Sequence, residues 1–457
     1  MTRIVSPNEV RPTGLDHDPQ ASRESVGTRP ARRGKWLTVG LLVLAAILSY
    51  TDRQILSLLV DPIRKDLSIS DLQIGVIQGM AFAFVYVFAG LPAGYLADTR
   101  SRRGVLLAGV SVWSVATIAC GLAAGFGSIV AARVFVGIGE AALAPSAVSI
   151  IIDLFPPRER GRAIAAFSAG MNVGSGVAIV IGGAVLALAQ RGAFAEIPII
   201  GGLAAWRLTV ILVGLCGMPL LLLLYIAVPT PQRHVAQTSI ISSVGLPQQI
   251  LCLAKSVWPL LLGMALLSVG DFATLSWTPT LLSRNFGASS GQIATTFGTM
   301  VLFAGMGGTM LGGYLSDLLA VRKGVGGRIA LAAIVAVLSL PFAFVWFAKE
   351  TWQVLFFVGG WQFVSAAAGI SAMAAILEIV SERNRGLTMS LIAFGNISFG
   401  FGLGATMTGF LTAHVFHSSL SIAPALTVLA APAAVLAAVV LFRAYRANRP
   451  GWDAAGG

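Results

Sequence analysis

Two pairs of oppositely charged residues interrupt the apolar stretches of this sequence. Asp52 and Arg53 are adjacent near the middle of the first long apolar run, and Arg133 and Glu140 lie in the fourth. An ionisable side chain at bilayer depth costs roughly 2.5–3.5 kcal/mol on insertion scales, so it persists there beside an aqueous cavity or a partner. The four residues therefore indicate machinery that moves a charged molecule. Fixed ion pairs that hold helices together are the alternative.

The sequence around these residues predicts an all-α integral membrane protein. Of its 457 residues, 56% are hydrophobic and 11% are charged, whereas soluble proteins carry about 25% charged residues. A helix that spans a bilayer needs about 20 residues, and these apolar runs lack the alternation of barrel strands. Twelve transmembrane helices are predicted, at residues 36–60, 72–97, 104–124, 128–152, 163–190, 204–228, 256–282, 292–318, 327–348, 351–379, 386–412 and 421–443.

The distribution of lysine and arginine predicts how the chain crosses the membrane. The N-terminal tail, the even-numbered loops and the C-terminal tail hold 23 of the 31 basic residues, and the odd-numbered loops hold five. Basic residues accumulate on the cytoplasmic side of membrane proteins. We therefore expect both termini in the cytoplasm and the protein in the cytoplasmic (inner) membrane. The net charge of +12 is then a topology signal, and no nucleic-acid partner is expected.

An internal repeat organises the chain. A Gly-Tyr-Leu-Ala-Asp motif ends at Asp98, and a Gly-Tyr-Leu-Ser-Asp motif ends 219 residues later at Asp317. The same separation relates two further pairs, Asp52 with Asp271 and Gln73 with Gln292. Two six-helix pseudo-repeats in the same orientation are one of the known transporter architectures. The predicted organisation is a disordered cytoplasmic tail (1–35), an N-terminal six-helix half (36–228), a cytoplasmic linker (229–255), a C-terminal six-helix half (256–445) and a cytoplasmic tail (446–457).

Charged residues around these motifs predict a gate on the cytoplasmic side. A glycine such as Gly94 lets two helices approach, and the carboxylate of Asp98 faces the arginines that follow it. Such clusters can hold the two halves together and release them during rocking, while solvated loops with membrane-surface arginines are the alternative. The predicted gate residues, which include two further acid–arginine segments 225 residues apart, are Gly94, Asp98, Arg102, Asp153, Arg160, Asp317, Glu378 and Arg385.

Together, these features resemble the major facilitator superfamily over residues 36–445, and within it the Spinster-like branch. The branch resemblance is carried by the segments Tyr50-Thr51-Asp52-Arg53, Arg133-Val134-Phe135-Val136-Gly137-Ile138-Gly139-Glu140-Ala141, Asp153-Leu154-Phe155-Pro156 and Arg160-Gly161-Arg162. The chain departs from the superfamily pattern at Thr99 and Ser101, where a basic residue and a glycine are usual. The charge relay in that loop is therefore expected to be weaker than in typical members.

The resemblance implies that spans one, four, seven and ten line a central cavity reached by Asp52, Arg53, Arg133, Glu140 and Asp271. Burial there favours the neutral form of a carboxylate, and a nearby arginine favours the charged form. Substrate binding to the arginine would remove the second effect, so proton and substrate movements can be coupled without a cofactor. Glu140 is the first candidate for the proton carrier and Asp52 the second. A structural Arg133–Glu140 pair that never titrates is the alternative.

The two halves predict different contributions to substrate binding. The predicted substrate-binding residues are Arg53 and Arg133 in the N-terminal half, and Asp271, Trp361 and Gln362 in the C-terminal half. This division suits an amphipathic anion with a charged head and an apolar body. It agrees with the Spinster-like resemblance, whose members are associated with lysophospholipids and sphingosine-1-phosphate. Aromatic or other small organic acids are the alternative substrates.

Other functions find little support in the motifs. The chain has no P-loop, and its one Gly-x-Ser-x-Gly match, Gly287 to Gly291, lies in a predicted loop, where Ser289 or Ser290 is better explained as a helix N-cap. The cysteines and histidines show no metal-ligand spacing. We therefore expect a proton-coupled secondary transporter rather than an enzyme, with no cofactor and no metal. A non-transporting membrane sensor is a further alternative.

Overall fold

The structure of the protein is a computed structural model. It describes residues 32–194, 196, 202–229, 246–381 and 384–448. Most of the predicted N-terminal tail, the predicted linker and the predicted C-terminal tail therefore lie outside the described residues.

The described residues form helices and connecting loops, without a strand. The elements before the linker are α1 (Arg32–Leu58), α2 (Val60–Leu67), α3 (Asp71–Gln78), α4 (Met80–Thr99), α5 (Arg102–Gly121), α6 (Phe126–Ala141), α7 (Leu143–Leu154), α8 (Pro157–Gln190) and α9 (Ala205–Ala227). Those after it are α10 (Leu246–Phe286), α11 (Ser290–Ser339), η1 (Leu340–Ala343), η2 (Val345–Phe347), α12 (Thr351–Ile379), α13 (Arg385–Gly395), η4 (Asn396–Ala405), α14 (Thr406–Phe410), η5 (Leu411–Val415) and α15 (Ile422–Ala447). The predicted all-α membrane fold is confirmed.

The predicted twelve spans correspond to eleven continuous helical stretches that are long and apolar enough to cross a membrane in the described part of the chain. One stretch, Ser290–Phe347, covers 58 residues and therefore contains the two predicted spans 292–318 and 327–348. The chain reverses within α11 at Gly324, whose φ of 56° and ψ of −150° are not helical. Glycine adopts this left-handed region at little cost, so the connection between the two spans is a single break.

Repeat-related residues have the same local role in both halves. Ser70 accepts a hydrogen bond from the backbone N–H of Gln73, whose side chain accepts one from the backbone of Ser70, and this capping box starts α3. Ser289 and Gln292 form the same capping box at the start of α11. Each box satisfies donors that a helix N-terminus leaves unpaired. Of the two predicted N-caps of this helix, Ser289 and Ser290, the structure contains Ser289.

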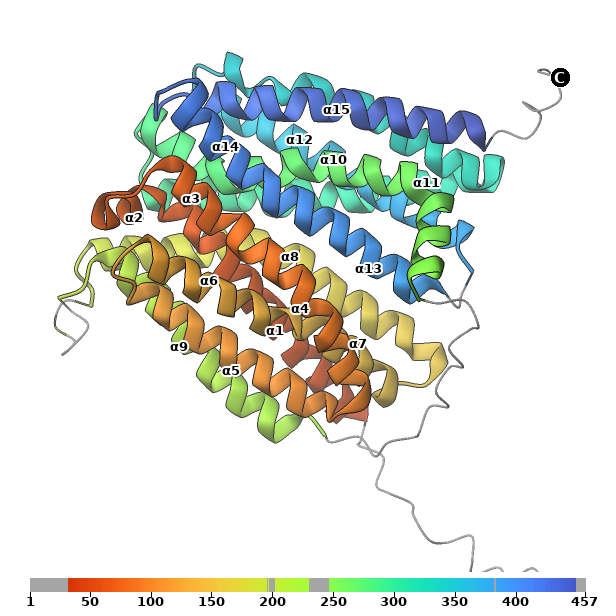
Figure 1. Ribbon diagram of the computed structural model, residues 1–457, viewed down its shortest axis with the longest axis horizontal. Helices are drawn as coiled ribbons and strands as arrows, with labels where there is room; N and C mark the ends of the chain where they lie inside the picture. Colours follow the sequence, from red (N-terminus) through yellow and green to blue (C-terminus); the bar gives the residue numbers. More distant parts are fainter. Residues whose placement is uncertain (1–31, 195, 197–201, 230–245, 382–383, 449–457) are drawn as a thin grey trace, which may run out of the picture.

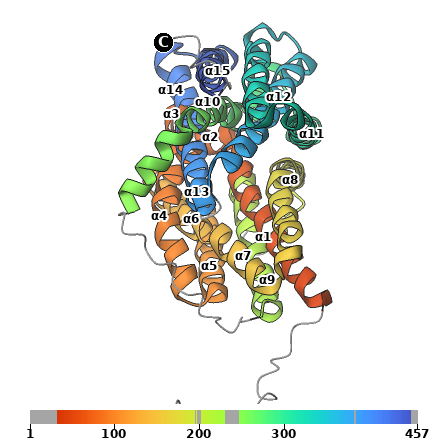
Figure 2. The same ribbon diagram turned by 90° about the vertical axis from the view of Figure 1, so that its right-hand side faces the viewer.

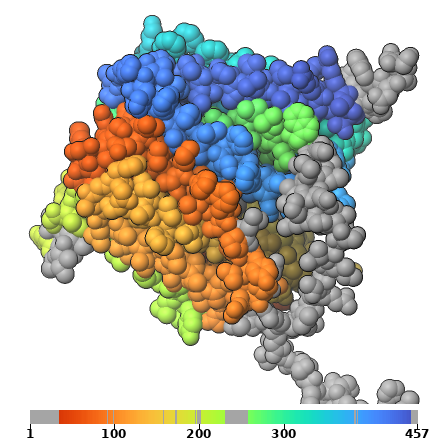
Figure 3. Space-filling model, viewed as in Figure 1, coloured from red at the N-terminus to blue at the C-terminus, as the bar shows by residue number. Residues whose placement is uncertain are grey.

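The helices form two bundles, α1 to α9 and α10 to α15, which lie one above the other in Figure 1. The views in Figures 1 and 2 place α8 against α11, and the N-terminal part of the second span, α3, against α14. The outer surface carries exposed apolar side chains such as Phe84, Leu222, Phe303 and Phe356, as expected of a surface that contacts lipid. In the space-filling view the α2–α3 segment and the α14–α15 segment touch directly (Figure 3).

The two bundles are also in close contact where α3 and α4 meet η4 and α14. The Thr406 hydroxyl donates a hydrogen bond to the carbonyl of Gly75 (3.1 Å) and accepts one from the backbone N–H of Met80 (3.3 Å). A Cβ atom on Gly79 would lie 2.4 Å from the carbonyl oxygen of Phe401, so this approach requires glycine. Phe401 belongs to η4, a π-helical segment inside the eleventh span. Such segments are frequent at functional sites.

Candidate functional site

The first buried ion pair of the N-terminal half joins Arg133 of α6 to Asp52 of α1. The Nη1 of Arg133 donates to Oδ2 of Asp52 (3.1 Å), and the Thr117 hydroxyl donates to Oδ1 (2.8 Å). Arg133 also donates from Nε to the carbonyl of Ile77 (3.4 Å). Arg133 and Asp52 are only 1% and 3% exposed, so the charges are compensated by each other and not by solvent.

The second buried ion pair joins Arg53 of α1 to Glu140 of α6. The Nε of Arg53 donates to Oε2 of Glu140 (2.6 Å), and the Ser49 hydroxyl donates to the same oxygen (2.7 Å). Glu140 is 1% exposed. The two pairs together contain two positive and two negative groups, so this buried cluster is neutral when all four are charged.

The alternative Arg133–Glu140 pair is not the pair that the structure contains. Both residues lie on one face of α6, as their spacing predicted, but each pairs with a different residue of α1. Adjacent residues on a helix point about 100° apart, because a turn takes 3.6 residues. Asp52 and Arg53 therefore reach different partners, and neither neutralises the other.

Aromatic rings surround the guanidinium of Arg53. Its Cζ lies over three rings of the N-terminal half, at 5.1 Å from Tyr50, 4.7 Å from Phe82 and 4.9 Å from Tyr86. The fourth ring is Phe401 of the C-terminal half, at 5.8 Å. Cations favour the negative face of such rings. Phe401 was not among the predicted site residues, because its distance in sequence hides its proximity to the first span.

Two polar atoms of these ion pairs have no hydrogen-bond partner within the described residues. They are Nη2 of Arg133 and Oε1 of Glu140, and both are buried. A buried polar atom left unsatisfied costs about 1–3 kcal/mol. The cluster therefore has one donor and one acceptor that gain free energy from any polar group brought to them.

The predicted residues of the C-terminal half come together around Asp271 of α10. Oδ1 of Asp271 accepts hydrogen bonds from the indole N–H of Trp361 (2.9 Å) and the hydroxyl of Ser365 (2.5 Å), both on α12. Gln362 donates to the backbone carbonyl of Asp271 (3.1 Å) and to the hydroxyl of Thr274 (3.1 Å). Among the described residues no cation pairs with Asp271, so its donors are all neutral.

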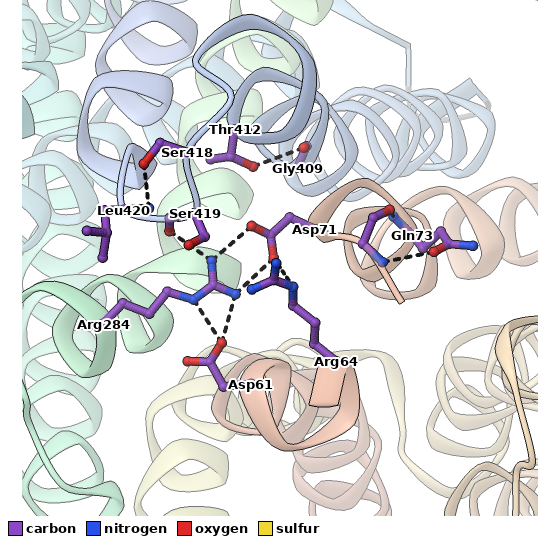
Figure 4. A network of polar contacts seen from close by, with 11 residues as sticks. Asp61, Arg64, Asp71, Gln73, Arg284, Gly409, Thr412, Ser418, Ser419 and Leu420 are labelled. Carbon is purple, nitrogen blue, oxygen red and sulfur yellow. Dashed lines mark hydrogen bonds and ion pairs between the residues drawn. The ribbon is translucent and has the colours of Figure 1, made fainter. Parts of the chain in front are cut away.

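A second charged network joins the two halves at the end of the molecule where α10 finishes (Figure 4). Arg284 of α10 donates from Nη1 and Nη2 to both carboxylate oxygens of Asp71 (2.9 and 2.8 Å) and from Nε to Asp61 (2.8 Å). It also donates to the carbonyl of Ser419 (2.9 Å), and Arg64 lies 3.5 Å from Asp71. We call Arg284, Asp61 and Asp71 the α10 latch. These residues were not among the predicted site residues.

At the opposite end, which we call the basic end (residues 98–103, 153–162, 317–328 and 378–385), the described ion pairs stay within one half. Arg102 pairs with Asp153, and Arg328 pairs with Asp317 (2.8 Å) and Glu378 (2.9 Å). Arg160 donates to the carbonyl of Phe155 (3.0 Å) instead of pairing with Asp153.

The remaining predicted gate residues are placed as follows. A Cβ atom on Gly94 would have no atom outside the helix of Gly94 within 4 Å. Arg385 is the first residue of α13. The side chain of Asp98 lies outside the described residues. Ser101, where the superfamily has glycine, caps α5 by accepting from the N–H of Gly104 (3.2 Å). Their role as a gate between the halves stays a prediction.

Known proteins are similar to this chain along most of its length. A sequence profile described as Major Facilitator Superfamily matches residues 42–365. An "MFS-type efflux pump" of Mycolicibacterium smegmatis is 27% identical over 391 residues, which cover 84% of this chain and 86% of the relative. A "Hexuronate transporter" of Bacillus subtilis is 25% identical over 386 residues, which cover 81% of this chain and 86% of the relative.

A solved structure is also similar. It is a crystal structure of a bacterial homologue of the human lysosomal transporter Spinster, in an inward-facing and unoccupied conformation. The TM-score is 0.74 at 25% sequence identity, and the match covers 91% of this chain and 98% of that chain. The resemblance to the Spinster-like branch that the sequence motifs predicted is thereby confirmed.

Proposed function

The chain belongs to the major facilitator superfamily, and from this premise we propose that it is a proton-coupled secondary active transporter that moves an organic anion by alternating access. Its relatives are multi-pass membrane transporters, and the expectation that this chain is a transporter rather than an enzyme is confirmed. The coupling to protons, the anion and the roles of individual residues are the proposal. So are the inner-membrane location and the cytoplasmic position of the basic end, which rest on the positive-inside rule.

The neutral cluster of two ion pairs is the observation that carries the proposal. An anion that binds Arg133 or Arg53 competes with Asp52 or Glu140 for the positive charge of the guanidinium. An uncompensated carboxylate at this depth costs several kcal/mol, and taking up a proton removes that cost. Anion and proton binding therefore favour each other. By linkage, the affinity for the anion should rise as the pH falls.

The distribution of ion pairs between the two ends supports alternating access. The α10 latch connects the halves at one end, while the described ion pairs of the basic end stay within a half. A molecule tied together at one end only is suited to opening at the other. The likeness to an inward-facing Spinster homologue supports the same reading, with the basic end on the open side.

We propose an amphipathic anion, such as a lysophospholipid, as the substrate. The arginines of the N-terminal half would receive the anionic group, and the aromatic side chains around Phe401 and Phe272 would receive the apolar part. A small organic acid is the second candidate, because a hexuronate transporter aligns with 81% of this chain.

Transport by the purified protein in proteoliposomes tests both candidates. Uptake of a labelled lysophospholipid and of labelled glucuronate is measured with and without a proton gradient, at mildly acidic and at mildly alkaline pH. We expect one of the two to accumulate against its gradient only when a proton gradient is imposed. Transport that is equally fast with and without the gradient, at both pH values, would contradict the coupling, and no transport of either anion would contradict the function.

A further inference from the structure

The aspartates at equivalent positions of the two repeats have different partners. Asp52 is 3% exposed and pairs with the guanidinium of Arg133, whereas Asp271 receives the indole N–H of Trp361 and the hydroxyl of Ser365. Both donors of Asp271 are neutral, so they orient the carboxylate without cancelling its charge. An uncompensated charge inside an apolar span is expensive and is a marker of function.

The geometry leaves one oxygen of Asp271 available. Both hydrogen bonds to this carboxylate end on Oδ1, and within the described residues none ends on Oδ2. Unlike Asp52, Asp271 is partly exposed, so a ligand can approach Oδ2. Trp361 is fully buried and therefore fixes the direction of the carboxylate. A fixed acceptor with one open oxygen is suited to a hydrogen-bond donor.

An aromatic bridge connects this acceptor to the arginines of the N-terminal half. Phe272 follows Asp271 in the chain, and its ring centroid lies 3.9 Å from that of Phe401. Phe401 in turn lies 5.8 Å from the guanidinium of Arg53. Two rings in contact thus lead from the cation of one half to the residue that follows the carboxylate of the other.

We propose that Asp271 accepts a hydrogen bond from a hydroxyl or ammonium group of the substrate. The inference rests on the proposed function and narrows the substrate class, because the substrate then carries a donor group in addition to its anionic group. Hydrogen bonds to a charged acceptor are stronger than neutral ones. Anions without a donor group, and anions with a second carboxylate at that position, are disfavoured.

Two matched pairs of probes test the inference and separate the two kinds of donor. Glucuronate, with several hydroxyls, is compared with cyclohexanecarboxylate. An alkylphosphoethanolamine, with a donating ammonium, is compared with the alkylphosphocholine of the same chain length, whose quaternary nitrogen has no N–H and which carries no hydroxyl. Binding of each probe to the purified full-length protein is measured. We expect the wild-type protein to prefer the donor-bearing member of at least one pair by about tenfold or more, as a hydrogen bond to a charged group provides. The pair that responds identifies the donor.

The variant Asp271→Asn tests whether Asp271 is the acceptor. The amide oxygen of asparagine can keep the bonds from Trp361 and Ser365, which places its NH₂ donor where Oδ2 was. The preference for the donor-bearing probe should then disappear, while binding of the other probe stays within about twofold. Asp66→Asn is the control, because Asp66 also accepts from an indole, that of Trp206 (3.0 Å), near the start of α9, where it pairs with Arg207 as well (2.7 Å). This control should keep the preference.

Each remaining outcome decides against the inference. A wild-type protein that binds both members of each pair equally, or an Asp271→Asn variant that keeps the preference, would overturn it while leaving an anion transporter in place. A wild-type protein that binds none of the four probes would overturn the proposed function as well. Because the asparagine is isosteric, the folded yield on size-exclusion chromatography should match that of the control.

Discussion

The two halves of this transporter use buried carboxylates in opposite ways. In the N-terminal half, Asp52 and Glu140 are each compensated by an arginine, and the four groups form a sealed neutral cluster. In the C-terminal half, Asp271 has no cationic partner among the described residues and is oriented by neutral donors. Under the proposed function, the same repeat position therefore serves two purposes. A compensated carboxylate can exchange its arginine for a proton, whereas an oriented, uncompensated one can recognise a ligand.

At the α10 latch, the charges are divided between the halves in the opposite way. There the C-terminal half contributes the cation, Arg284, and the N-terminal half contributes the carboxylates, Asp61 and Asp71. Under the proposed function, we expect charge in the N-terminal half of the substrate region to serve coupling, and charge between the halves to serve conformational change. Substitutions in the ion pairs of the N-terminal half and substitutions in the α10 latch should therefore affect different measured properties.

The largest effect is expected from Arg133→Ala, which should abolish transport more completely than Asp271→Ala. The substitution removes an anion ligand and leaves Asp52 buried without a cation, at a cost of roughly 3–5 kcal/mol. Initial uptake rates in proteoliposomes, normalised to folded protein, measure the effect. Full activity in Arg133→Lys would instead indicate simple charge pairing, because lysine cannot bind an anion in the planar bidentate manner of arginine.

A second substitution separates folding from transport. Asp52→Asn combined with Arg133→Ala removes both members of the ion pair, so no buried charge is left unpaired. We expect this double variant to recover folded yield and still fail to transport. If it transported normally, Arg133 would have only a structural role.

The next effect in size is expected from Glu140→Gln. Glutamine keeps the shape and the hydrogen-bond acceptor that Ser49 and Arg53 contact, but it cannot titrate. Exchange of substrate across the membrane, which needs no net proton movement, should survive, while uphill accumulation should be lost. Both are measured in the same proteoliposomes.

Two other results of that experiment would change the assignment. If Glu140 is a structural counter-ion, the variant leaves Arg53 buried and uncompensated, and folded yield and exchange should fall together. Accumulation that persists in Glu140→Gln would transfer the proton to Asp52, the second candidate.

The sequence predicted the spans well because hydrophobicity and length decide them. The predicted span 351–379 coincides with α12, and the paired capping boxes at Gln73 and Gln292 follow the predicted repeat. The position of the turn between the predicted spans 292–318 and 327–348 was not predicted, because it depends on the backbone of Gly324. One glycine in a glycine-rich chain does not reveal that its φ is positive.

The sequence located the charged residues of the site but not their pairing. Periodicity places Arg133 and Glu140 on one face of a helix, yet it says nothing about which residues of α1 that face meets. Arg284 was counted only as one of five basic residues in odd-numbered loops. Basic residues are rare in these loops. That rarity, together with the nearby acidic residues Asp61 and Asp71, was the feature of the sequence that could have predicted the α10 latch.

The α10 latch should respond to Arg284→Gln by opening more often. The substitution removes the ion pairs to Asp61 and Asp71, and each factor of ten in population corresponds to about 1.4 kcal/mol. Spin labels on α2 and on the first turn of α15 measure the separation of the halves at this end. The adjacent Asn285→Ala, which loses only a bond to the Leu420 carbonyl, is the control and should leave the distances unchanged. Equal distances in Arg284→Gln and the wild type would show that helix packing alone holds this end closed.

The smallest effect is expected at Phe401, the one ring among the described residues that the C-terminal half contributes to the surroundings of Arg53. A cation–π contact is worth about 0.5–2 kcal/mol, so Phe401→Leu should slow transport by about two- to thirtyfold, while Phe401→Tyr keeps the ring and most of the rate. Phe410→Leu, in the following α14, removes a ring that contacts only His414 among the described aromatic residues and serves as the control. If leucine and tyrosine at position 401 behaved alike, the ring would fill space without touching the charge. The contrast between the halves would then rest on Asp271 and the two ion pairs alone. No aromatic side chain would then couple a change at Arg53 to the C-terminal half.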